Sequence, residues 1–435
     1  MGSAMLSPLI GLSRFGLSSY FNWANGNGKL MRSVLTGVDV GTSKVCVLIA
    51  EIQPHGGIVL LGYGAAPCSG VRRGVVANIE ATVEALRASI SEAQKSAGVG
   101  IGAAAVGISG AHIHGINSHG IVAVRGGEVG ARDIQRVIDA ARAVAIPLDR
   151  EVLHILPQQF AVDDQERVRD PTGMAGVRLE ARIHIVTAAQ SYSQNLKKCC
   201  DRAGISMLDV VFAPLASAEA ALYPEERELG VALIDIGGGT TDIAVFHGGA
   251  VMHTAVLPIG GGHVTSDIAD GLRAPISEAE RLKVNYGAAT DLSIRRNEIV
   301  QMPGVGGRAP REIPRQQLSE IIEPRMEEIF VMSQRELLRS GVGDSLGSGV
   351  VLAGGTSLLE GAQELAEQIF NLPVRRRLPT NASHVPEELM KPVYTTAAGL
   401  MLNSAGWHGN ANGLAPYGGW GGLRLRVTGW IRDFF

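Results

Sequence analysis

The stretch "LIDIGGGTTDIAVFH", residues 233–247, repeats the pattern of an earlier stretch, "GVDVGTSKVCVLIAE", residues 37–51. In each copy an apolar strand carries an aspartate, a glycine-led turn with hydroxyl side chains follows, and a second apolar strand begins. A single copy would be explained by an ordinary hairpin. Two copies with the aspartate at the same offset predict a duplicated α/β unit, and therefore a molecule of two lobes.

The composition of the two turns indicates anion binding. Glycine has no β-carbon, so backbone N–H groups can approach an anion closely, and Ser and Thr hydroxyls add further donors. The sequence contains neither GxxxxGK[ST] nor a GxGxxG that joins a strand to a helix, which argues against a P-loop and against a dinucleotide site. The candidate phosphate-binding residues are Gly41, Thr42, Ser43 and Lys44 in the first turn and Gly237, Gly238, Gly239, Thr240 and Thr241 in the second.

The aspartates of the two copies suggest a metal ion. Asp39 and Asp235 each lie two residues before the first glycine of a turn. Mg²⁺ prefers few carboxylates together with waters and the oxygens of its substrate. We therefore expect Asp39 and Asp235 to hold Mg²⁺, directly or through water, beside the bound phosphates.

Two later segments are candidates for contacts with a nucleoside. "GVVLAGGTSLLEG", residues 349–361, reads as a buried strand followed by Gly354, Gly355 and Thr356 at the start of a helix, where a flat base could lie against the backbone. A plain strand-to-helix turn explains this segment equally well. In "SEAERLK", Glu280 and Lys283 are three residues apart and share one helix face, which is also the pattern of a solvated ion pair.

Bulk composition excludes several classes of protein. A chain of 435 residues with 46% hydrophobic and 19% charged residues is expected to be globular and larger than one small core. A net charge of −3 gives no electrostatic reason to expect nucleic acid as a partner. The four cysteines do not have the spacing of metal ligands, so we expect reduced thiols.

The chain ends in "LRLRVTGWIRDFF", residues 423–435, behind a glycine-rich run. As a helix of about 20 Å this segment is too short to cross a bilayer, but it can lie in the bilayer surface. Gly429 costs about 1 kcal/mol in a helix, so we expect the segment to fold on lipid. The candidate membrane residues are the apolar face of Leu423, Val427, Trp430, Ile431, Phe434 and Phe435, with Arg424, Arg426 and Arg432 for anionic headgroups. Docking on the protein's own surface or on a partner protein would also suit such a helix.

The order of these motifs resembles the actin/Hsp70/sugar-kinase ATPase superfamily. "DVGTSK" and "DIGGGTTD" are similar to its two phosphate loops, "VVLAGGTSLL" to its adenosine motif, and "EAERLK" to the Glu-x-x-Lys that holds the nucleoside in Hsp70-like members. In "LPIGGGHVTSDIA", Gly261 and Gly262 resemble the paired glycines that follow the second loop. The resemblance implies that ATP and Mg²⁺ bind between the lobes.

Longer stretches narrow the resemblance to the bacterial cell-division family FtsA. They include "VLHILPQQFAVDDQERVRDPTGMAGVRLEARIHIVTA" and "VGGRAPREIPRQQLSEIIEPRMEEI", and the likeness covers about residues 35–403 plus the tail. It implies an α/β, actin-like two-lobed ATPase fold of duplicated βββαβα units with an inserted subdomain. It also implies filaments of the chain itself, attachment to anionic lipid on the cytoplasmic face of the inner membrane at the division site, and binding of the FtsZ C-terminal peptide and other division proteins.

Two other functions remain open at this point. A small-molecule kinase of the same superfamily would give no role to the amphipathic tail. A pilus-assembly actin-like ATPase shares the phosphate loops, and the tail argues against it as well.

The resemblance also divides the chain into segments. We expect a flexible N-terminal extension, a first lobe with core subdomain 1A and inserted subdomain 1C, a second lobe with core subdomain 2A and outer subdomain 2B, a closing helix, a linker and the tail. The boundaries are 1–34 for the extension, 35–109 for 1A, 110–190 for 1C, 191–230 for the rest of the first-lobe core, 231–260 for 2A, 261–340 for 2B, 341–392 for the rest of the second-lobe core, 393–403 for the closing helix, 404–422 for the linker and 423–435 for the tail.

Two functional expectations follow from departures and matches within the family pattern. In Hsp70-like relatives a carboxylate precedes a Pro-Thr-Ala segment and positions the attacking water. Here Ala213 stands before Pro214, and Glu219 follows on the next helix. The sequence therefore predicts weak or absent ATP hydrolysis, with ATP acting mainly as a conformational ligand.

For binding of FtsZ, the resemblance points to the outer part of the second lobe, where Arg308, Arg311 and Arg315 are the candidate residues. A solvated loop would explain these three arginines equally well.

Overall fold

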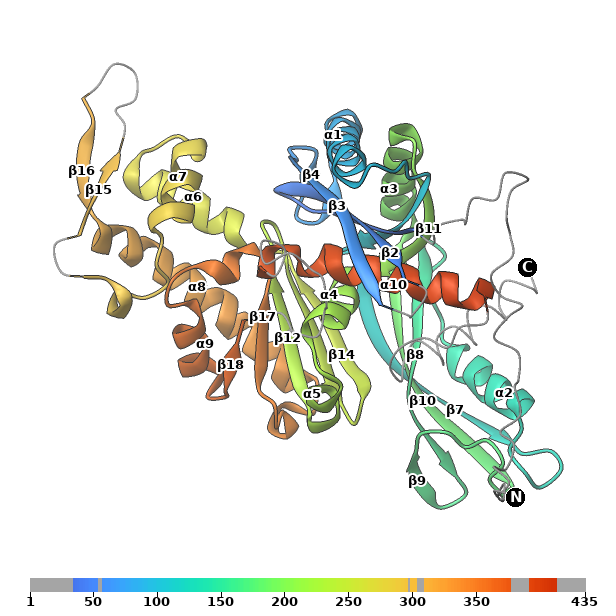
Figure 1. Cartoon of the computed structure of the whole chain (residues 1–435). Helices are drawn as coiled ribbons and strands as arrows, with labels where there is room; N and C mark the ends of the chain where they lie inside the picture. The colour runs from blue at the N-terminus through green and yellow to red at the C-terminus, as the bar shows by residue number, and fades with distance from the viewer. Residues whose placement is uncertain (1–33, 54–56, 296–297, 303–308, 377–390, 413–435) are drawn as a thin grey trace, which may run out of the picture.

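The computed structural model describes residues 34–53, 57–295, 298–302, 309–376 and 391–412 (Figure 1). Two five-stranded sheets lie at the centre of the molecule, in the orders β11-β6-β1-β2-β3 and β14-β13-β12-β17-β18. The first comprises β1 (Val34–Val40), β2 (Lys44–Ile52), β3 (Ile58–Pro67), β6 (Ala103–Ile108) and β11 (Ser206–Phe212). The second comprises β12 (Val231–Ile236), β13 (Thr241–His247), β14 (Ala250–Leu257), β17 (Val350–Ala353) and β18 (Val374–Arg375).

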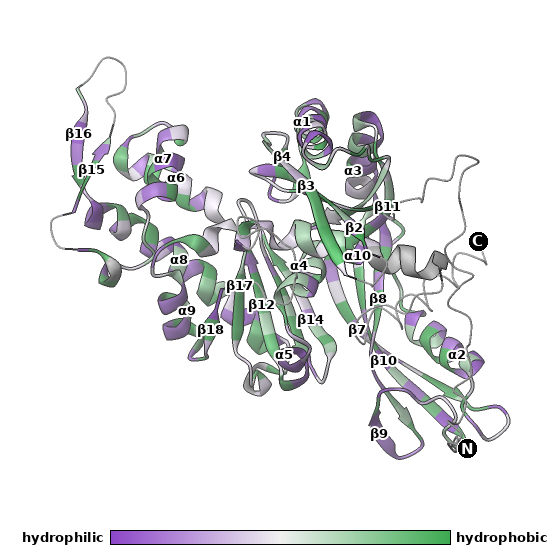
Figure 2. Ribbon diagram, in the orientation of Figure 1, coloured by the Kyte–Doolittle hydropathy of each residue, from purple (hydrophilic) through white to green (hydrophobic). Residues whose placement is uncertain are grey.

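The two sheets have the same connectivity. In the first, β1 pairs with β2 antiparallel and with β6 parallel. In the second, β12 pairs with β13 antiparallel and with β17 parallel. The central strands are apolar and buried on both faces, as expected for strands covered on both sides (Figure 2). The duplicated α/β unit expected from the two repeated stretches is therefore present.

Helices α4 (Ala213–Ala221) and α10 (Thr395–Asn412) pack on the central sheets. Helix α4 contacts strands of both sheets, and α10 packs along α4 and along β1 of the first lobe. The helices approach so closely that a β-carbon on Gly399 would lie 1.7 Å from the carbonyl oxygen of Ala216. A β-carbon on Gly37 would likewise lie 2.4 Å from the backbone nitrogen of Met401. Glycine at these two positions lets backbone pack directly on backbone.

The inserted subdomain has a sheet and a core of its own. Its strands have the order β7-β10-β8-β9, and α2 packs on β7 and β10. The subdomain also packs against β14 of the second lobe, although the chain enters and leaves it from the first lobe. The elements are β7 (His114–Ala123), α2 (Ala131–Arg142), β8 (Arg150–Val162), β9 (Gln165–Val168) and β10 (Arg178–Ala189).

The outer part of the second lobe is mainly helical. The elements there are α6 (Gly261–Leu272), α7 (Ile276–Tyr286), the 3-10 turn η1 (Asp291–Ser293), β15 (Ile299–Met302), β16 (Arg311–Pro314), α8 (Arg315–Arg339) and the 3-10 turn η2 (Gly343–Ser345). The remaining elements are β4 (Val71–Arg72), β5 (Val75–Val76), α1 (Ile79–Ala97), α3 (Gln190–Ala203), α5 (Pro224–Leu229), the 3-10 turn η3 (Gly355–Leu358), α9 (Ala362–Phe370) and the 3-10 turn η5 (Pro392–Tyr394).

Two expected elements differ in the structure. Helix α10 continues to Asn412, nine residues into the segment expected to be a linker. The sequence predicts a helix that starts at Thr356, whereas Thr356 lies in the short 3-10 turn η3 and α9 begins only at Ala362. Gly361 lies between the two elements in the left-handed conformation, with φ of 75°, so the helix cannot start before it.

Among the helices that the structure describes, none is both long and apolar enough to span a membrane.

Candidate functional site

The two glycine-led turns have the same local geometry. In the first, the Gly41 N–H donates to the Lys44 carbonyl oxygen at 3.0 Å, and in the second the Gly237 N–H donates to the Thr240 carbonyl oxygen at 2.9 Å. Each turn joins the first two strands of its sheet. Because the strands pair in the same way, the two turns lie at equivalent ends of the central strands in the two sheets.

The turns meet across the boundary between the lobes. A β-carbon on Gly239 would lie 2.5 Å from Thr42 Oγ1, and a β-carbon on Gly238 would lie 3.3 Å from Ser43 Cβ. Glycine is therefore required in the second turn, because a side chain there would strike the first. The structure thus brings together the hydroxyls of one predicted phosphate loop and the bare backbone of the other.

The later predicted nucleotide-binding segments converge on the second turn. The N–H groups of Gly261 and Gly262, at the start of α6, donate to the carbonyl oxygens of Gly237 and Gly238 at 2.9 and 2.6 Å. Thr356 Oγ1 donates to the same Gly237 oxygen at 3.1 Å. The start of α6 and the turn η3 therefore lie against the Gly237 end of the second turn.

Lys283 joins this cluster through a buried ammonium group. Its Nζ donates to the Gly261 carbonyl oxygen at 3.0 Å, to Thr265 Oγ1 at 2.8 Å and to Glu280 Oε2 at 2.7 Å. Lys283 is only 8% exposed, whereas the side chain of Glu280 is 48% exposed, so only the lysine end of the pair is buried. Glu280 also accepts a hydrogen bond from Thr265, so the pair is held in place from α6.

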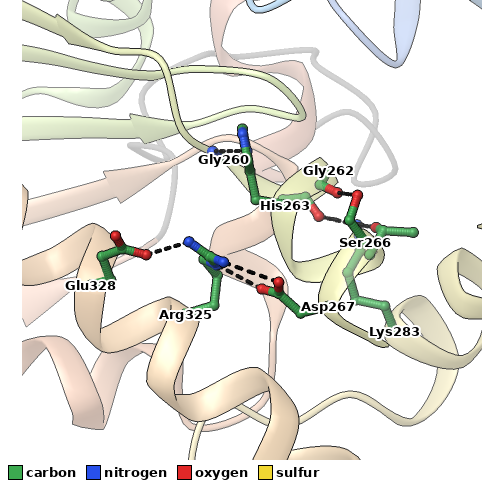
Figure 3. A network of polar contacts seen from close by, with 10 residues as sticks. Gly260, Gly262, His263, Ser266, Asp267, Lys283, Arg325 and Glu328 are labelled. Carbon is green, nitrogen blue, oxygen red and sulfur yellow. Dashed lines mark hydrogen bonds and ion pairs between the residues drawn. The ribbon is translucent and has the colours of Figure 1, made fainter. Parts of the chain in front are cut away.

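Helix α6 is anchored from its other side by α8 (Figure 3). The Arg325 guanidinium donates to both carboxylate oxygens of Asp267, at 2.6 and 3.0 Å, and also pairs with Glu328. At the start of α6 the Gly260 N–H donates to His263 Nδ1 at 3.2 Å. This two-pronged ion pair fixes the helix whose first residues touch the second turn.

Three buried or partly buried carboxylates surround the turns. Burial raises the pKa of Asp39 to about 6, with Lys44 opposing this rise and Asp235 adding to it. Burial also raises the pKa of Asp235, against hydrogen bonds from Ser217 and Thr396. For Asp242, burial raises the pKa to about 7. A bound cation would relieve this cost of holding negative charge out of water.

The two predicted metal residues are not equivalent. Asp235 Oδ2 already accepts hydrogen bonds from Ser217 of α4 at 2.6 Å and Thr396 of α10 at 3.0 Å. The Asp39 carboxylate receives no hydrogen bond from the residues that the structure describes. Within those residues no group of three or more His, Cys, Asp or Glu side chains forms a ready-made metal site. The donor set fits Mg²⁺ held mainly by waters and phosphate oxygens, with Asp39 as the more available protein group.

Asp242 is a site residue that the sequence analysis missed. Ser109, directly after β6 of the first lobe, donates through Oγ to Asp242 Oδ1 at 2.5 Å. Thr240 donates to Asp242 Oδ2 at 3.2 Å. The signal was present as the last residue of "GGGTTD", but the first copy has Cys46 at the equivalent position, opposite Asp39, so the comparison of the two copies passed over it.

Lys44 does not face the second turn. Its Nζ donates to the Val393 carbonyl oxygen at 2.9 Å and lies 4.1 Å from the centre of the Tyr394 ring. The lysine thus contacts the segment that leads into α10. Its charge also acts on the two predicted metal residues, where it opposes the rise in the pKa of Asp39 and of Asp235.

The predicted partner arginines have other contacts. Arg308 lies outside the described residues. Arg311 donates to the Leu272 carbonyl oxygen. The Arg315 side chain is 11% exposed and pairs with Glu298 at 3.0 Å and with Glu360. The predicted membrane residues, 423–435, also lie outside the described part of the chain.

Comparisons with known proteins agree with this architecture. The family model "Cell division protein FtsA" matches residues 232–399, and "SHS2 domain inserted in FTSA" matches residues 110–187. The cell division protein FtsA of Pseudomonas aeruginosa is 50% identical over 369 residues, which cover 85% of this chain and 88% of the relative.

Two solved structures share the fold. The PilM-PilN type IV pilus biogenesis complex superposes with a TM-score of 0.61 at 17% identity, over 85% of this chain and 98% of that one. MreB5 of Spiroplasma citri bound to ADP superposes with a TM-score of 0.52 at 15% identity, over 87% of this chain and 98% of that one. The expected actin-like fold with an inserted subdomain is therefore confirmed.

Proposed function

The chain belongs to the FtsA family of cell division proteins, and from this premise we propose that it binds ATP with Mg²⁺ between its lobes, polymerises on the cytoplasmic membrane and tethers FtsZ filaments there. In this account the protein helps to assemble the septal ring at the division site. ATP sets the conformation that polymerises, the tail holds lipid, and the outer second lobe holds the FtsZ C-terminal peptide.

The observation that carries the nucleotide proposal is the meeting of the two turns. The backbone of Gly238 and Gly239 lies against the side chains of Ser43 and Thr42 at the lobe boundary. Such a concave set of donors suits a chain of phosphates. A related fold, that of MreB5 of Spiroplasma citri, has been solved with ADP and with AMPPNP, which supports the same class of ligand here.

Asp39 would hold the magnesium ion, with Asp235 acting through water. The ion supplies positive charge that offsets the repulsion among the phosphates and the buried carboxylates. The chain's own part is to orient the ligand, because the turns of the two lobes meet at Thr42 and Gly239. Closure on the nucleotide then fixes the angle between the lobes.

Slow hydrolysis fits the same geometry. Ala213 begins α4 and carries no carboxylate. Glu219 lies on that helix but is exposed and pairs with Arg227 at 3.2 Å. Asp242 is held by Ser109 and Thr240. No carboxylate among these is free to position a water, so ATP serves mainly to select a conformation.

Membrane attachment follows from many weak contacts. One short amphipathic helix binds lipid reversibly, whereas several helices in one filament bind far more tightly, because each later contact is effectively intramolecular. If ATP favours the filament, ATP also favours residence on the membrane. The nucleotide acts through avidity and needs no new contact with lipid.

Vesicle co-sedimentation tests this link. The full chain is mixed with anionic phospholipid vesicles, with and without Mg²⁺–ATP, beside a variant that ends at residue 422. We expect the full chain to pellet more with ATP, and the shortened chain to stay in solution while it still binds nucleotide. Continued pelleting of the shortened chain would refute the role of residues 423–435. The variant Arg426→Gln, which changes the polar side of the helix, is the control. The free energy of membrane binding should weaken by only about 1 kcal/mol in this variant.

A further inference from the structure

A short hairpin beside the two turns contains an unusual arginine. Strands β4 and β5 pair in the register Val71 with Val76 and Arg72 with Val75, which leaves Arg73 and Gly74 as a two-residue turn. Their φ values are 48° and 78°, so both residues are in the left-handed region, as a type I′ turn requires. Glycine adopts this conformation freely, whereas arginine rarely does. A non-glycine residue held there is a reason to look for a function.

The tip of this hairpin touches both phosphate-loop turns. The Gly74 N–H donates to Thr42 Oγ1 of the first turn at 3.2 Å. A β-carbon on Gly239 of the second turn would lie 3.0 Å from the Arg73 Cα. Arg73 therefore lies at the junction of the two lobes, although nothing in its local sequence resembles a phosphate loop.

The position along the second turn indicates which end of a nucleotide Arg73 would meet. Thr356, a predicted nucleoside contact, bonds to the Gly237 carbonyl oxygen, and Lys283, another, bonds to Gly261, whose N–H donates to the same oxygen. Arg73 packs instead against Gly239, two residues further along the turn. A nucleotide with its base at the α6 and η3 end would thus extend its terminal phosphate toward the hairpin.

The charge balance of the site calls for a cation at this point. Lys44 and Lys283 are both engaged with other groups. Three carboxyl groups, those of Asp39, Asp235 and Asp242, are buried beside the turns, and a cation there would favour their ionised forms. The exposed guanidinium of Arg73 makes no ion pair or hydrogen bond within the described residues, and the same holds for Arg72. Arginine binds phosphate oxygens through two parallel N–H groups, which gives it both charge and orientation.

We propose that Arg73 binds the terminal phosphate of the nucleotide and makes the site distinguish a nucleoside triphosphate from a diphosphate. This inference rests on the proposed nucleotide binding and deepens it. Because the hairpin belongs to the first lobe and Gly239 to the second, a phosphate held by Arg73 would also tie the two lobes together. The link between the lobes would then form with a nucleoside triphosphate and be absent with a diphosphate.

Binding constants of the full chain for Mg²⁺–AMPPNP and Mg²⁺–ADP, measured by isothermal titration calorimetry, test the proposal. AMPPNP is used because it is not hydrolysed during the measurement. In Arg73→Ala we expect affinity for AMPPNP to fall by about 10-fold or more, the size of a lost charge-assisted contact, while affinity for ADP changes by less than about 2-fold. Arg72→Ala removes the same charge one residue away and should leave both affinities unchanged.

A second variant separates the charge from the fold. Arg73→Gly suits the left-handed backbone, so its thermal midpoint should equal or exceed that of the wild type, yet it should lose AMPPNP affinity as Arg73→Ala does. An unchanged ratio of AMPPNP to ADP affinity in both Arg73 variants would overturn the inference, as would an equal loss in Arg72→Ala. A wild-type chain that binds neither nucleotide would overturn the proposed function itself.

Discussion

Asp242 shows how a single residue couples the lobes. It belongs to the second lobe, is 6% exposed, and accepts a hydrogen bond from Ser109 of the first lobe. Burial raises the pKa of its carboxyl group to about 7, so the native state holds this proton more tightly than the unfolded chain, in which the carboxyl titrates near 3.8. The stability gained from the proton is complete below about pH 3.8 and is lost progressively as the pH rises from there to about 7.

Replacement of this carboxyl by an amide should therefore change stability in a pH-dependent way. Asp242→Asn keeps an oxygen that can accept from Ser109, and it cannot ionise. We expect the variant to be more stable than the wild type at pH 8 by on the order of 1–4 kcal/mol, by roughly half as much at pH 5.5, and by little near pH 4. Thermal unfolding of both proteins at the three pH values measures this difference.

The difference between the two proteins is the informative quantity. Burial lowers the pKa of His112 to about 4 and that of His184 to about 3, so both histidines destabilise the native state as the pH falls below 6.5. Their effect is the same in both proteins and cancels. A gap between variant and wild type that does not vary with pH would contradict the raised pKa of Asp242.

At this scale the sequence predicts residues that are duplicated and misses those that are not. Asp39 and Asp235 were identified because each copy contains one at the same offset. Asp242, Ser109 and Arg73 have no counterpart in the repeated pattern, and their roles arise from long-range contacts. The direction of Lys44 toward Val393 is likewise set by a segment 349 residues away.

At the scale of elements, close backbone packing joins α4, α10 and β1. Helix α10 lies on β1 and α4 with glycine at both contacts. Asp235 then bonds to one hydroxyl from each helix, Ser217 and Thr396, which themselves lie 3.0 Å apart. These contacts make α4, α10 and the second phosphate-loop strand one packed unit.

A methyl group at the closest of these contacts should separate the unit. Gly399→Ala places its β-carbon 1.7 Å from the Ala216 carbonyl oxygen, so the helices must move apart. We expect a loss of about 2–3 kcal/mol in the free energy of unfolding, although alanine favours a helix by about 1 kcal/mol. Urea denaturation measures the loss. Gly102→Ala, with no atom within 4 Å of the new β-carbon, is the control and should be nearly neutral.

A buried histidine joins the inserted subdomain to the second lobe. His184 of β10 is 1% exposed; its Nδ1 lies 2.6 Å from Asn117 Oδ1 and its Nε2 lies 2.8 Å from Thr254 Oγ1 of β14. Since an amide oxygen can only accept, Nδ1 carries the proton and Nε2 accepts from the threonine hydroxyl. Only β13 lies between β14 and β12 in the sheet. The contact between His184 and Thr254 therefore connects the inserted subdomain to the sheet that carries the second turn.

Loss of the threonine hydroxyl should weaken this joint. Thr254→Val keeps the shape but leaves Nε2 buried without a donor, which costs about 1–3 kcal/mol, whereas Thr254→Ser retains the bond. We expect faster amide exchange in β14 and β10 of the valine variant, measured by hydrogen–deuterium exchange. Equal exchange in the valine and serine variants would mean that the hydroxyl does not hold the subdomains together.

The sequence predicts where helices and strands begin and end better than it predicts which of them pack together. The helix expected to end at Gly98 does so, with Gly98 at φ of 65°. The packing of the inserted sheet on β14 has no signature in the sequence, because it depends on single polar contacts between residues about 70 positions apart. The error at Thr356 has a local cause, since the left-handed Gly361 delays the start of α9.

At the scale of the whole molecule, duplication places two equivalent turns face to face. The two sheets have the same strand order, each turn is closed by the same backbone hydrogen bond, and the turns touch at Thr42 and Gly239. The helices α4 and α10 link the sheets behind the turns, and the hairpin at Arg73 lies beside them. A ligand that enters between the turns must therefore act on both lobes at once.

The most direct measurement is a crystal structure of the full chain grown with Mg²⁺–AMPPNP. The account predicts a triphosphate held between residues 41–44 and 237–241, the base near Gly354 and Lys283, and the magnesium ion near Asp39. A crystal with saturating nucleotide in which this boundary holds no ligand, or in which the two turns lie apart with the nucleotide bound elsewhere, would contradict it.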